Sequence, residues 1–290
     1  MKLATLSHRD ETFVAAIDSD AATARPISID GRPVSDMLEL IGHAASGGSC
    51  SQGDPIPLGE ATVLAPIPRP RRNVMCVGKN YYEHAHEFTK SGFDSSASSA
   101  SDAVPKAPII FTKMPESVVG PDTAIGYPGN QCEQLDYEAE LGVVIGKAGQ
   151  SIKPENAMDH VFGFVVINDL TARDLQAVHK QWFLGKSFET SCPMGPWLVT
   201  ADEVDSGDLQ VQCWVNGELR QNSNTRDLIF DIPTLIATLS RGMTLLPGDV
   251  IATGTPVGVG IGFTPPKFLQ PGDKVEVEIT GLGRLSNTIR

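Results

Sequence analysis

The sequence is poor in positive charge. Its 290 residues include 23 Lys and Arg against 35 Asp and Glu, so the formal net charge is −12 at pH 7. A protein that binds DNA or RNA needs a basic surface, because Lys and Arg must neutralise phosphates and release counterions. No stretch of the chain supplies such a surface. The composition therefore argues against a nucleic-acid partner and favours a small-molecule role.

Long apolar segments and paired cysteines are also missing. No run approaches the roughly 18 apolar residues of a membrane-spanning helix. The five cysteines are scattered and form no CxxC pair, which is typical of reduced thiols. The first twenty residues carry Asp10, Glu11 and Asp18, which are unusual in a secretory or transit peptide. We therefore expect a cytoplasmic protein with no membrane partner.

The order of apolar and turn-forming segments predicts an α+β protein that is mostly β. A Pro-rich joint at residues 65–72 divides a small N-terminal domain, 1–68, from a larger domain, 69–290. A helix is expected at 34–45, starting from Ser35. After residue 108, short apolar strands alternate with Gly and Pro turns, which favours antiparallel or mixed sheet over a doubly wound nucleotide fold.

Smaller features complete this outline. Asn-Gly in the sequence VNGEL is typical of a type I′ hairpin turn. Two more helices are expected at 171–181 and 231–242. The segment at 91–108 is rich in Ser, Ala and Asp and has no periodicity. It is either a lid, covering about 80–107, or a plain surface insertion.

Three acidic residues alternate along one predicted strand. Asp136, Glu138 and Glu140 occupy every second position and run directly into the apolar sequence Leu-Gly-Val-Val-Ile. Side chains at this period lie on one face of a strand. If that face is solvated, it is an ordinary polar surface. If it is buried, it needs a cation, because neighbouring carboxylates repel by about 3 kcal/mol at an effective dielectric constant of about 20.

Asp169 could complete a metal site with these residues. It ends the apolar sequence VFGFVVIND, where a buried strand stops and its side chain emerges. Glu138, Glu140 and Asp169 would form an all-oxygen site, which suits Mg²⁺ or Mn²⁺ rather than Zn²⁺. Spacing alone leaves Asp136 and Glu133 as other possible ligands.

Three further features could carry chemistry. His84 and Glu87 lie three apart on a predicted helix, so the carboxylate could orient a general base, unless this is a solvated polar helix. No second His follows at the spacing of an HExxH zinc helix. Lys186 could neutralise a substrate anion or lie at the surface. The glycine segment, residues 252–262, lacks the GK[ST] of a phosphate loop, so backbone approach to a small ligand is the better prediction.

Together these segments resemble the fumarylacetoacetate hydrolase family, a metal-dependent group that includes acylpyruvate hydrolases, oxaloacetate decarboxylases, and dienedioate isomerases and hydratases. The matching segments are, in the family's order, VGKNYYEH, LDYEAELGVVIGK, INDLTARDLQ, GKSFETSCPMGP, VNGELRQNSNT and LLPGDVIATGTPVGVG. The resemblance runs from about Asn73 to the C-terminus. It implies a mixed β-sandwich roll around a divalent ion, with a small N-terminal domain to which no chemistry is assigned.

The resemblance also implies roles for individual residues. Asp136 matches an adjacent acid that is not expected to touch the ion. The implied ligands of Mg²⁺ or Mn²⁺, with Ca²⁺ possible in crystals, are Glu138, Glu140 and Asp169. The implied catalytic residues are His84, Glu87 and Lys186. The implied substrate contacts are Gln176, Thr255 and Lys79. The sequence departs from the family's pattern at Glu189, where Asp is common, and at Lys79, where Arg or an apolar residue is common.

The predicted function is metal-dependent hydrolysis of a C–C bond in an acylpyruvate-like 2,4-dioxo acid, through a metal-stabilised pyruvate enolate. His84, oriented by Glu87, would activate the water. An oxaloacetate-type decarboxylase, or an isomerase or hydratase of 2-oxo dienedioates in aromatic catabolism, is the alternative, because related enolates serve all of these reactions. A non-catalytic metal- or ligand-binding protein is the alternative of another class. The family's usual assembly implies a homodimer.

Overall fold

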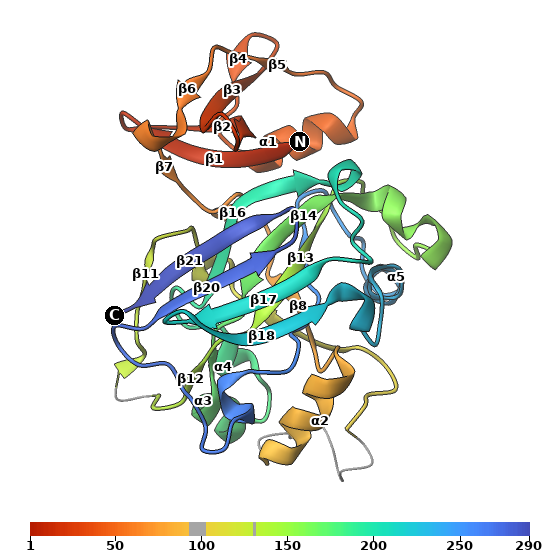
Figure 1. Ribbon diagram of the computed structural model, residues 1–290. Helices are drawn as coiled ribbons and strands as arrows, with labels where there is room; N and C mark the ends of the chain where they lie inside the picture. Colours follow the sequence, from red (N-terminus) through yellow and green to blue (C-terminus); the bar gives the residue numbers. More distant parts are fainter. Residues whose placement is uncertain (93–102, 130–131) are drawn as a thin grey trace.

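Two packed β-sheets form the body of the protein (Figure 1), described in a computed structural model for residues 1–92, 103–129 and 132–290. The strands of the larger sheet follow the order β4-β3-β2-β1-β16-β14-β13-β19-β8-β9, and those of the smaller sheet the order β11-β21-β20-β17-β18. The larger sheet is mixed, because β19 and β8 run parallel whereas β13 and β14 run antiparallel. The predicted α+β, mostly β class is confirmed.

The strands are β1 (Lys2–His8), β2 (Glu11–Asp18), β3 (Thr23–Ile29), β4 (Arg32–Pro33), β5 (Ser51–Gln52), β6 (Ile56–Pro57), β7 (Thr62–Val63), β8 (Val74–Gly78), β9 (Ile109–Lys113), β10 (Val118–Val119), β11 (Ala124–Ile125), β12 (Leu135–Asp136), β13 (Ala139–Ile145), β14 (Val161–Asn168), β15 (Thr171–Ala172), β16 (Cys192–Thr200), β17 (Gln210–Val215), β18 (Glu218–Asn224), β19 (Val250–Ala252), β20 (Lys274–Ile279) and β21 (Gly283–Ile289). The α-helices are α1 (Met37–Ala45), α2 (Tyr82–Ser91), α3 (Arg173–His179), α4 (Phe183–Lys186) and α5 (Ile232–Ser240). In the described part of the chain, no helix has the length and apolar character to cross a membrane.

Both faces of β13, near the centre of the larger sheet, are buried. Along β13, Leu141 and Val143 pack into a core shared with the smaller sheet. The next side chain, Val144, packs into a second core that includes Met37 and Ile41 of α1. A strand covered on both faces reads as a continuous apolar run, which explains the sequence that follows Glu140.

The N-terminal part continues the larger sheet. Strand β1 pairs antiparallel with β16, and Leu3 lies opposite Leu198. The predicted boundary at residue 68 falls between β7 and β8. Whether the two parts fold independently stays a prediction.

Local signals predicted most helices and the hairpin correctly. Asn216 and Gly217 connect β17 and β18 with φ values of 52° and 82°, as a type I′ turn requires. The predicted Ser35 start of α1 is wrong, because Asp36 is the N-cap and its carboxylate accepts a hydrogen bond from Leu38 N. Of the lid predicted at 80–107, α2 is described, whereas residues 93–102 lie outside the described residues.

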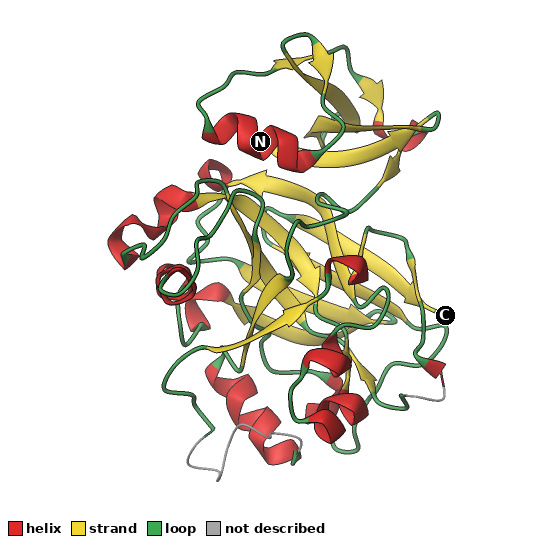
Figure 2. Ribbon diagram, turned by 180° about the vertical axis from the view of Figure 1, so that it is seen from behind, coloured by secondary structure: helices red, strands yellow, loops and turns green. Residues whose placement is uncertain are grey.

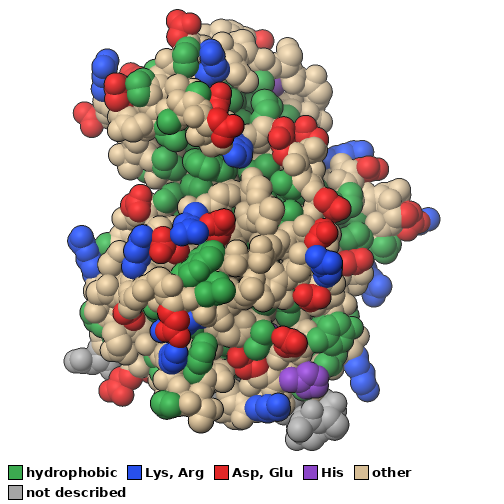
Figure 3. Space-filling model, in the orientation of Figure 1, with side chains coloured by type: hydrophobic (Ala, Val, Ile, Leu, Met, Phe, Trp, Pro, Cys, Tyr) green, Lys and Arg blue, Asp and Glu red, His purple; other side chains and the backbone are tan. Residues whose placement is uncertain are grey.

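Helices α2, α3 and α4 gather at the end of the sheets opposite the N-terminal part (Figure 2). On the face shown in Figure 3, acidic and basic side chains are interspersed. The chemistry-bearing segments named above converge near α2, α3 and α4.

Candidate active site

Three buried carboxylates lie together where β13 begins and β14 ends. Glu138, Glu140 and Asp169 each offer an oxygen within 4.8 Å of the others, and each residue is at most 5% exposed. Antiparallel pairing of β13 with β14 produces this arrangement, because Ala139 lies opposite Asn168. All three alternating carboxylates are therefore buried rather than solvated, but they do not share one strand, because Asp136 lies on β12 and Glu140 on β13.

Three buried cations contact this cluster. Lys186 Nζ lies 2.8 Å from Glu138 Oε2 and 2.6 Å from Asp169 Oδ2. Lys113 Nζ lies 2.7 Å from Asp169 Oδ1. Arg173 Nη2 lies 2.7 Å from Glu138 Oε1, an ion pair between two buried side chains. Burial opposes the charge on Glu138, but Lys186 and Arg173 outweigh it and hold the pKa of Glu138 below its usual range.

Glu140 has a different environment. Among the described residues, no cation lies within ion-pair distance of its carboxylate, which accepts a hydrogen bond from Gly254 N. Burial, together with Asp169 and Glu138, raises the pKa of Glu140 well above its usual range. A bound cation would relieve this penalty, and an all-carboxylate donor set suits a hard divalent ion. Glu138, Glu140 and Asp169 therefore fit Mg²⁺ or Mn²⁺.

The predicted pair on α2 is formed. His84 Nδ1 lies 3.1 Å from Glu87 Oε2, and His84 is 4% exposed. The imidazole stacks on Phe88, with ring centroids 6.0 Å apart. Glu87 also accepts a hydrogen bond from Gly258 N at 3.1 Å. The alternative of a solvated polar helix is wrong for this face of α2, although His86 on the same helix is exposed.

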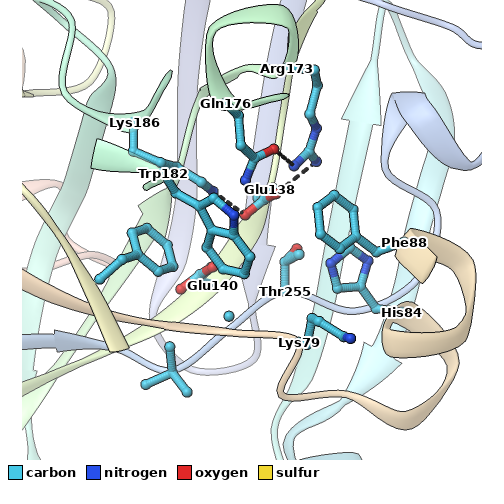
Figure 4. Close-up of a pocket in the computed structure, with 13 residues that line it drawn as sticks. Lys79, His84, Phe88, Glu138, Glu140, Arg173, Gln176, Trp182, Lys186 and Thr255 are labelled. Carbon is cyan, nitrogen blue, oxygen red and sulfur yellow. Dashed lines mark hydrogen bonds and ion pairs between the residues drawn. The ribbon is translucent and has the colours of Figure 1, made fainter. Parts of the chain in front are cut away.

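A narrow pocket joins the pair to the acidic cluster (Figure 4). His84 and Phe88 stand on one side, and Lys186 and Trp182 stand on the other. The cavity measures about 20 Å³, room for about one water molecule. Its lining residues are Val77, Gly78, Lys79, His84, Phe88, Phe111, Glu138, Glu140, Arg173, Gln176, Trp182, Lys186 and Thr255.

The predicted substrate contacts all line this pocket. Gln176 Oε1 accepts a hydrogen bond from Arg173 Nη1 at 3.2 Å, and Thr255 Oγ1 accepts one from Gln221 Nε2 at 2.8 Å. Lys79 is buried and has a left-handed backbone conformation, with φ of 56°. Asp169 and Glu87 do not line the pocket but contact side chains that do.

The glycine segment serves the protein's own carboxylates. Gly254 N donates to Glu140, and Gly258 N donates to Glu87. Gly260 N and Ile261 N donate to Asp136. These amides are directed at side chains that form or support the site, whereas Thr255 of the same segment lines the pocket, so the approach of this backbone to a small ligand stays a prediction.

Asp136 supports the cluster from a separate position. Its carboxylate accepts a hydrogen bond from Arg173 Nε at 2.9 Å, in addition to the amide hydrogen bonds from the glycine segment. Arg173 in turn reaches Glu138. Asp136 therefore connects the glycine segment to the pocket and does not join the three clustered carboxylates.

Sequence analysis missed Lys113 and Arg173. Lys113 ends the predicted strand PIIFTK, and Arg173 stands three residues before Gln176. Both are essentially fully buried, at 0% and 1% exposure. The only available signal was a cation at the border of an apolar strand or helix, which is also common at protein surfaces.

The cysteines offer no nucleophile in the pocket. Cys50 is exposed, whereas Cys76, Cys132, Cys192 and Cys213 are buried. Burial raises the pKa of the Cys192 thiol to about 12. A thiol with such a pKa is protonated near neutral pH and therefore unreactive.

Sequence comparison relates this chain to a known family. The model described as "Fumarylacetoacetate (FAA) hydrolase C-terminal" matches residues 73–290. Oxaloacetate tautomerase YisK of Bacillus subtilis (strain 168) is 52% identical over 233 residues, which cover 80% of this chain and 74% of that protein. The human mitochondrial oxaloacetate tautomerase FAHD2A is 47% identical over 237 residues, covering 81% and 71%.

Solved structures of similar fold are also found. Fumarylacetoacetate hydrolase from psychrophilic Exiguobacterium antarcticum superposes with a TM-score of 0.84 at 38% identity, covering 100% of this chain and 99% of that one. Maleylpyruvate hydrolase from Sphingobium sp. SYK-6, in complex with manganese(II) ion and pyruvate, gives a TM-score of 0.75 at 27% identity, covering 100% and 98%.

Proposed function

Because the chain belongs to the fumarylacetoacetate hydrolase family, we propose that it is an enzyme that interconverts the keto and enol forms of a 2-oxo dicarboxylate such as oxaloacetate. The observation that carries the proposal is a single buried imidazole, His84, in a pocket whose other walls hold Glu138, Glu140 and Lys186. Such a pocket places a proton carrier beside a site for an anionic, chelating substrate. The activity named for two close relatives supports the same reaction.

Glu138, Glu140 and Asp169 would hold Mg²⁺ or Mn²⁺. When bound there, the ion would act as a Lewis acid that polarises the 2-keto group of the substrate. Glu138 and Glu140 line the pocket, and Asp169, which does not, contacts Lys186 of the pocket wall.

His84 would move the proton. A carboxylate accepts the hydrogen bond at Nδ1, so the proton is assigned to Nδ1 and Nε2 is the basic nitrogen. Nε2 would take a proton from the carbon next to the keto group and return it to the enolate oxygen, so that no atom is gained or lost. In the reverse direction the same nitrogen would carry the proton from oxygen to carbon.

Cationic side chains would stabilise the charge that develops. Lys186 Nζ contacts two carboxylates and so remains an ammonium group, which suits it to stabilise an enolate rather than to act as a base. Arg173 lines the pocket and is paired with Glu138, so its guanidinium would add positive charge beside a bound anion. Gln176, Thr255 and Lys79 line the same pocket and would contact the rest of the substrate.

Hydrolysis of an acylpyruvate is the second candidate, and the contact between His84 and Glu87 favours it. A base oriented in this way can also deprotonate a water molecule that attacks the distal carbonyl of a 2,4-dioxo acid. Cleavage would then yield a carboxylic acid and pyruvate. Decarboxylation of oxaloacetate would form the same pyruvate enolate without an attacking water.

The test measures the enol form of the substrate and the released products separately. The protein is stripped with a chelator, restored with Mg²⁺ or Mn²⁺ and mixed with freshly dissolved oxaloacetate, and the ultraviolet absorbance of the enol is recorded. We expect an enzyme-dependent approach to the keto–enol equilibrium without release of pyruvate. Acetate and pyruvate from acetylpyruvate, with no effect on the enol, would instead establish the hydrolase. Carbon dioxide from oxaloacetate would identify a decarboxylase.

A further inference from the structure

We propose that Lys113 is a positioning residue that orients Asp169 for metal binding. This inference rests on the proposed metal site, but it does not depend on which reaction the enzyme catalyses. Lys113 does not line the pocket, so it would affect the site through its charge or through its contacts with Asp169, Leu170 and Lys186.

The contacts of Lys113 use its whole hydrogen-bonding capacity. It is the last residue of β9 and is 0% exposed. Its ammonium group donates to Asp169 Oδ1 at 2.7 Å, to the Leu170 carbonyl at 3.1 Å and to the Lys186 carbonyl. An ammonium group has three N–H donors, and a buried charge is tolerated when all of them are satisfied.

These contacts divide the two oxygens of Asp169 between two lysines. Lys113 holds Oδ1, and Lys186 contacts Oδ2 at 2.6 Å. Because Lys186 Nζ also contacts Glu138, Oδ2 is the oxygen directed toward the other carboxylates. With Oδ1 held, the carboxylate of Asp169 cannot rotate freely, so a defined oxygen faces the cluster.

Lys113 also fixes the backbone at Lys186. The Lys186 carbonyl accepts hydrogen bonds from Lys113 Nζ and from Ser191 Oγ, the latter at 2.9 Å. Ser191 therefore shares one contact of Lys113, but its side chain does not touch Asp169 in the described part of the chain. A Ser191→Ala variant thus separates the effect on the Lys186 backbone from the effect on the Asp169 carboxylate.

Lys113 could act only as a nearby positive charge or as a group that orients Asp169. These two roles predict opposite changes in metal affinity when Lys113 is replaced. If Lys113 were only a nearby positive charge, its removal would make the cluster more negative and would strengthen binding of a divalent cation. If Lys113 orients Asp169, its removal frees that ligand. Loss of a group that orients a metal ligand typically weakens metal binding about 10- to 100-fold.

The experiment is calorimetric titration of Mn²⁺ into the chelator-treated, full-length protein. For Lys113→Met we expect a Kd about 10 to 100 times that of the unaltered protein. We also expect a smaller rise in melting temperature with saturating Mn²⁺, because less binding energy stabilises the fold. Ser191→Ala should change the Kd by less than about threefold, since it leaves Asp169 in place.

Equal or tighter binding of Mn²⁺ by Lys113→Met would overturn the proposal. If that variant does not fold, Lys113→Arg decides, because it keeps the positive charge and moves the donor atoms. Weakened binding in Lys113→Arg supports positioning, and unchanged binding contradicts it. Failure of the unaltered protein to bind Mn²⁺ would instead reject the metal site itself, which distinguishes the two failures.

Discussion

His84 and His86 offer a matched comparison on one helix. His84 is buried beside Glu87 and lines the pocket, whereas His86 is exposed. General acid–base groups contribute typically about 10²- to 10⁴-fold to a rate. We therefore expect His84→Gln to lower kcat for the enol–keto conversion by that factor and His86→Gln to leave it within about twofold. Steady-state kinetics with Mn²⁺ present measures both variants.

Two further measurements make this comparison decisive. Unchanged Mn²⁺ affinity and melting temperature in His84→Gln would show that the metal site and fold are intact. A His84→Gln protein that retains full activity would reject His84 as the proton carrier, and equal losses in both variants would point to α2 as a whole.

Sequence reasoning found the acidic residues and Lys186, but not Lys113 and Arg173, the other two cations that contact them. The period of two predicted that Glu138 and Glu140 lie on one face of a strand. The spacing of three predicted that His84 and Glu87 lie on one face of a helix. Lys113 contacts Asp169 across 56 residues of sequence. No local period encodes such a pair, so its position depends on which strands lie side by side.

The start of α1 shows how one residue decides a helix boundary. Both Ser35 and Asp36 are common N-cap residues, and the sequence alone favoured Ser35. The carboxylate of Asp36 accepts a hydrogen bond from Leu38 N, and Met37 then becomes the first helical residue, buried against the larger sheet. Burial of Met37 therefore selects the register of α1.

This geometry gives a stability prediction. Asp36→Ala should lower the free energy of unfolding by about 1 kcal/mol, because a backbone N–H at the start of α1 loses its partner. Ser35→Ala should change it by less than about 0.5 kcal/mol. Denaturant titrations of both variants measure this free energy. A larger loss of stability in Ser35→Ala than in Asp36→Ala would show that Ser35 is the N-cap.

Gly262 in the glycine segment lies close to Glu87. A Cβ at this position would overlap the Glu87 carboxylate, so an added methyl group would move the end of that side chain. The glycine content predicted that this backbone closely approaches another group. One such group, Glu87, lies on a helix far away in the sequence. Glu87 and Gly258 are 171 residues apart.

Gly262→Ala should therefore displace Glu87 and disturb the orientation of His84. A misplacement of about 1 Å can cost up to about 100-fold in rate, so we expect a loss of this order in kcat. Gly59→Ala is the control, because nothing lies within 4 Å of its added Cβ. Activity of Gly262→Ala equal to that of Gly59→Ala would show that the contact between Glu87 and His84 is dispensable.

The fold class could be predicted from the sequence, but which strands pair with one another could not. Six ordered motifs identified the family, and the alternation of strands and turns gave the mostly β class. The reaction stays a proposal, because two relatives are named oxaloacetate tautomerases whereas the sequence predicted hydrolysis, with decarboxylation, isomerisation or hydration as alternatives. Pairing of β1 with β16 joins residues nearly two hundred positions apart, and a sequence read strand by strand does not give such partners. The homodimer stays a prediction.

The pairing of β1 with β16 joins the N-terminal part to the sheet that carries the candidate active site. Apolar side chains from β1, β3 and α1 share one core with β13, β14 and β16. Examples are Leu3 and Ile41 on one side and Val144, Ile167 and Leu198 on the other. Burial of each such side chain stabilises a fold by about 1.5–3 kcal/mol. Loss of several contacts of this kind would rival a net stability of about 5–15 kcal/mol.

We therefore expect the fragment 69–290 to lose the cooperative thermal transition of the full chain and to aggregate, even though it contains every pocket residue. Adding the separate fragment 1–68 should restore solubility and Mn²⁺ binding if the two parts can reassemble across β1 and β16. Circular dichroism and calorimetry measure both effects. A soluble 69–290 fragment that melts at the full-length temperature and binds Mn²⁺ equally well would show instead that the boundary near residue 68 separates independent domains, and that the shared core adds little to the stability of the catalytic sheet.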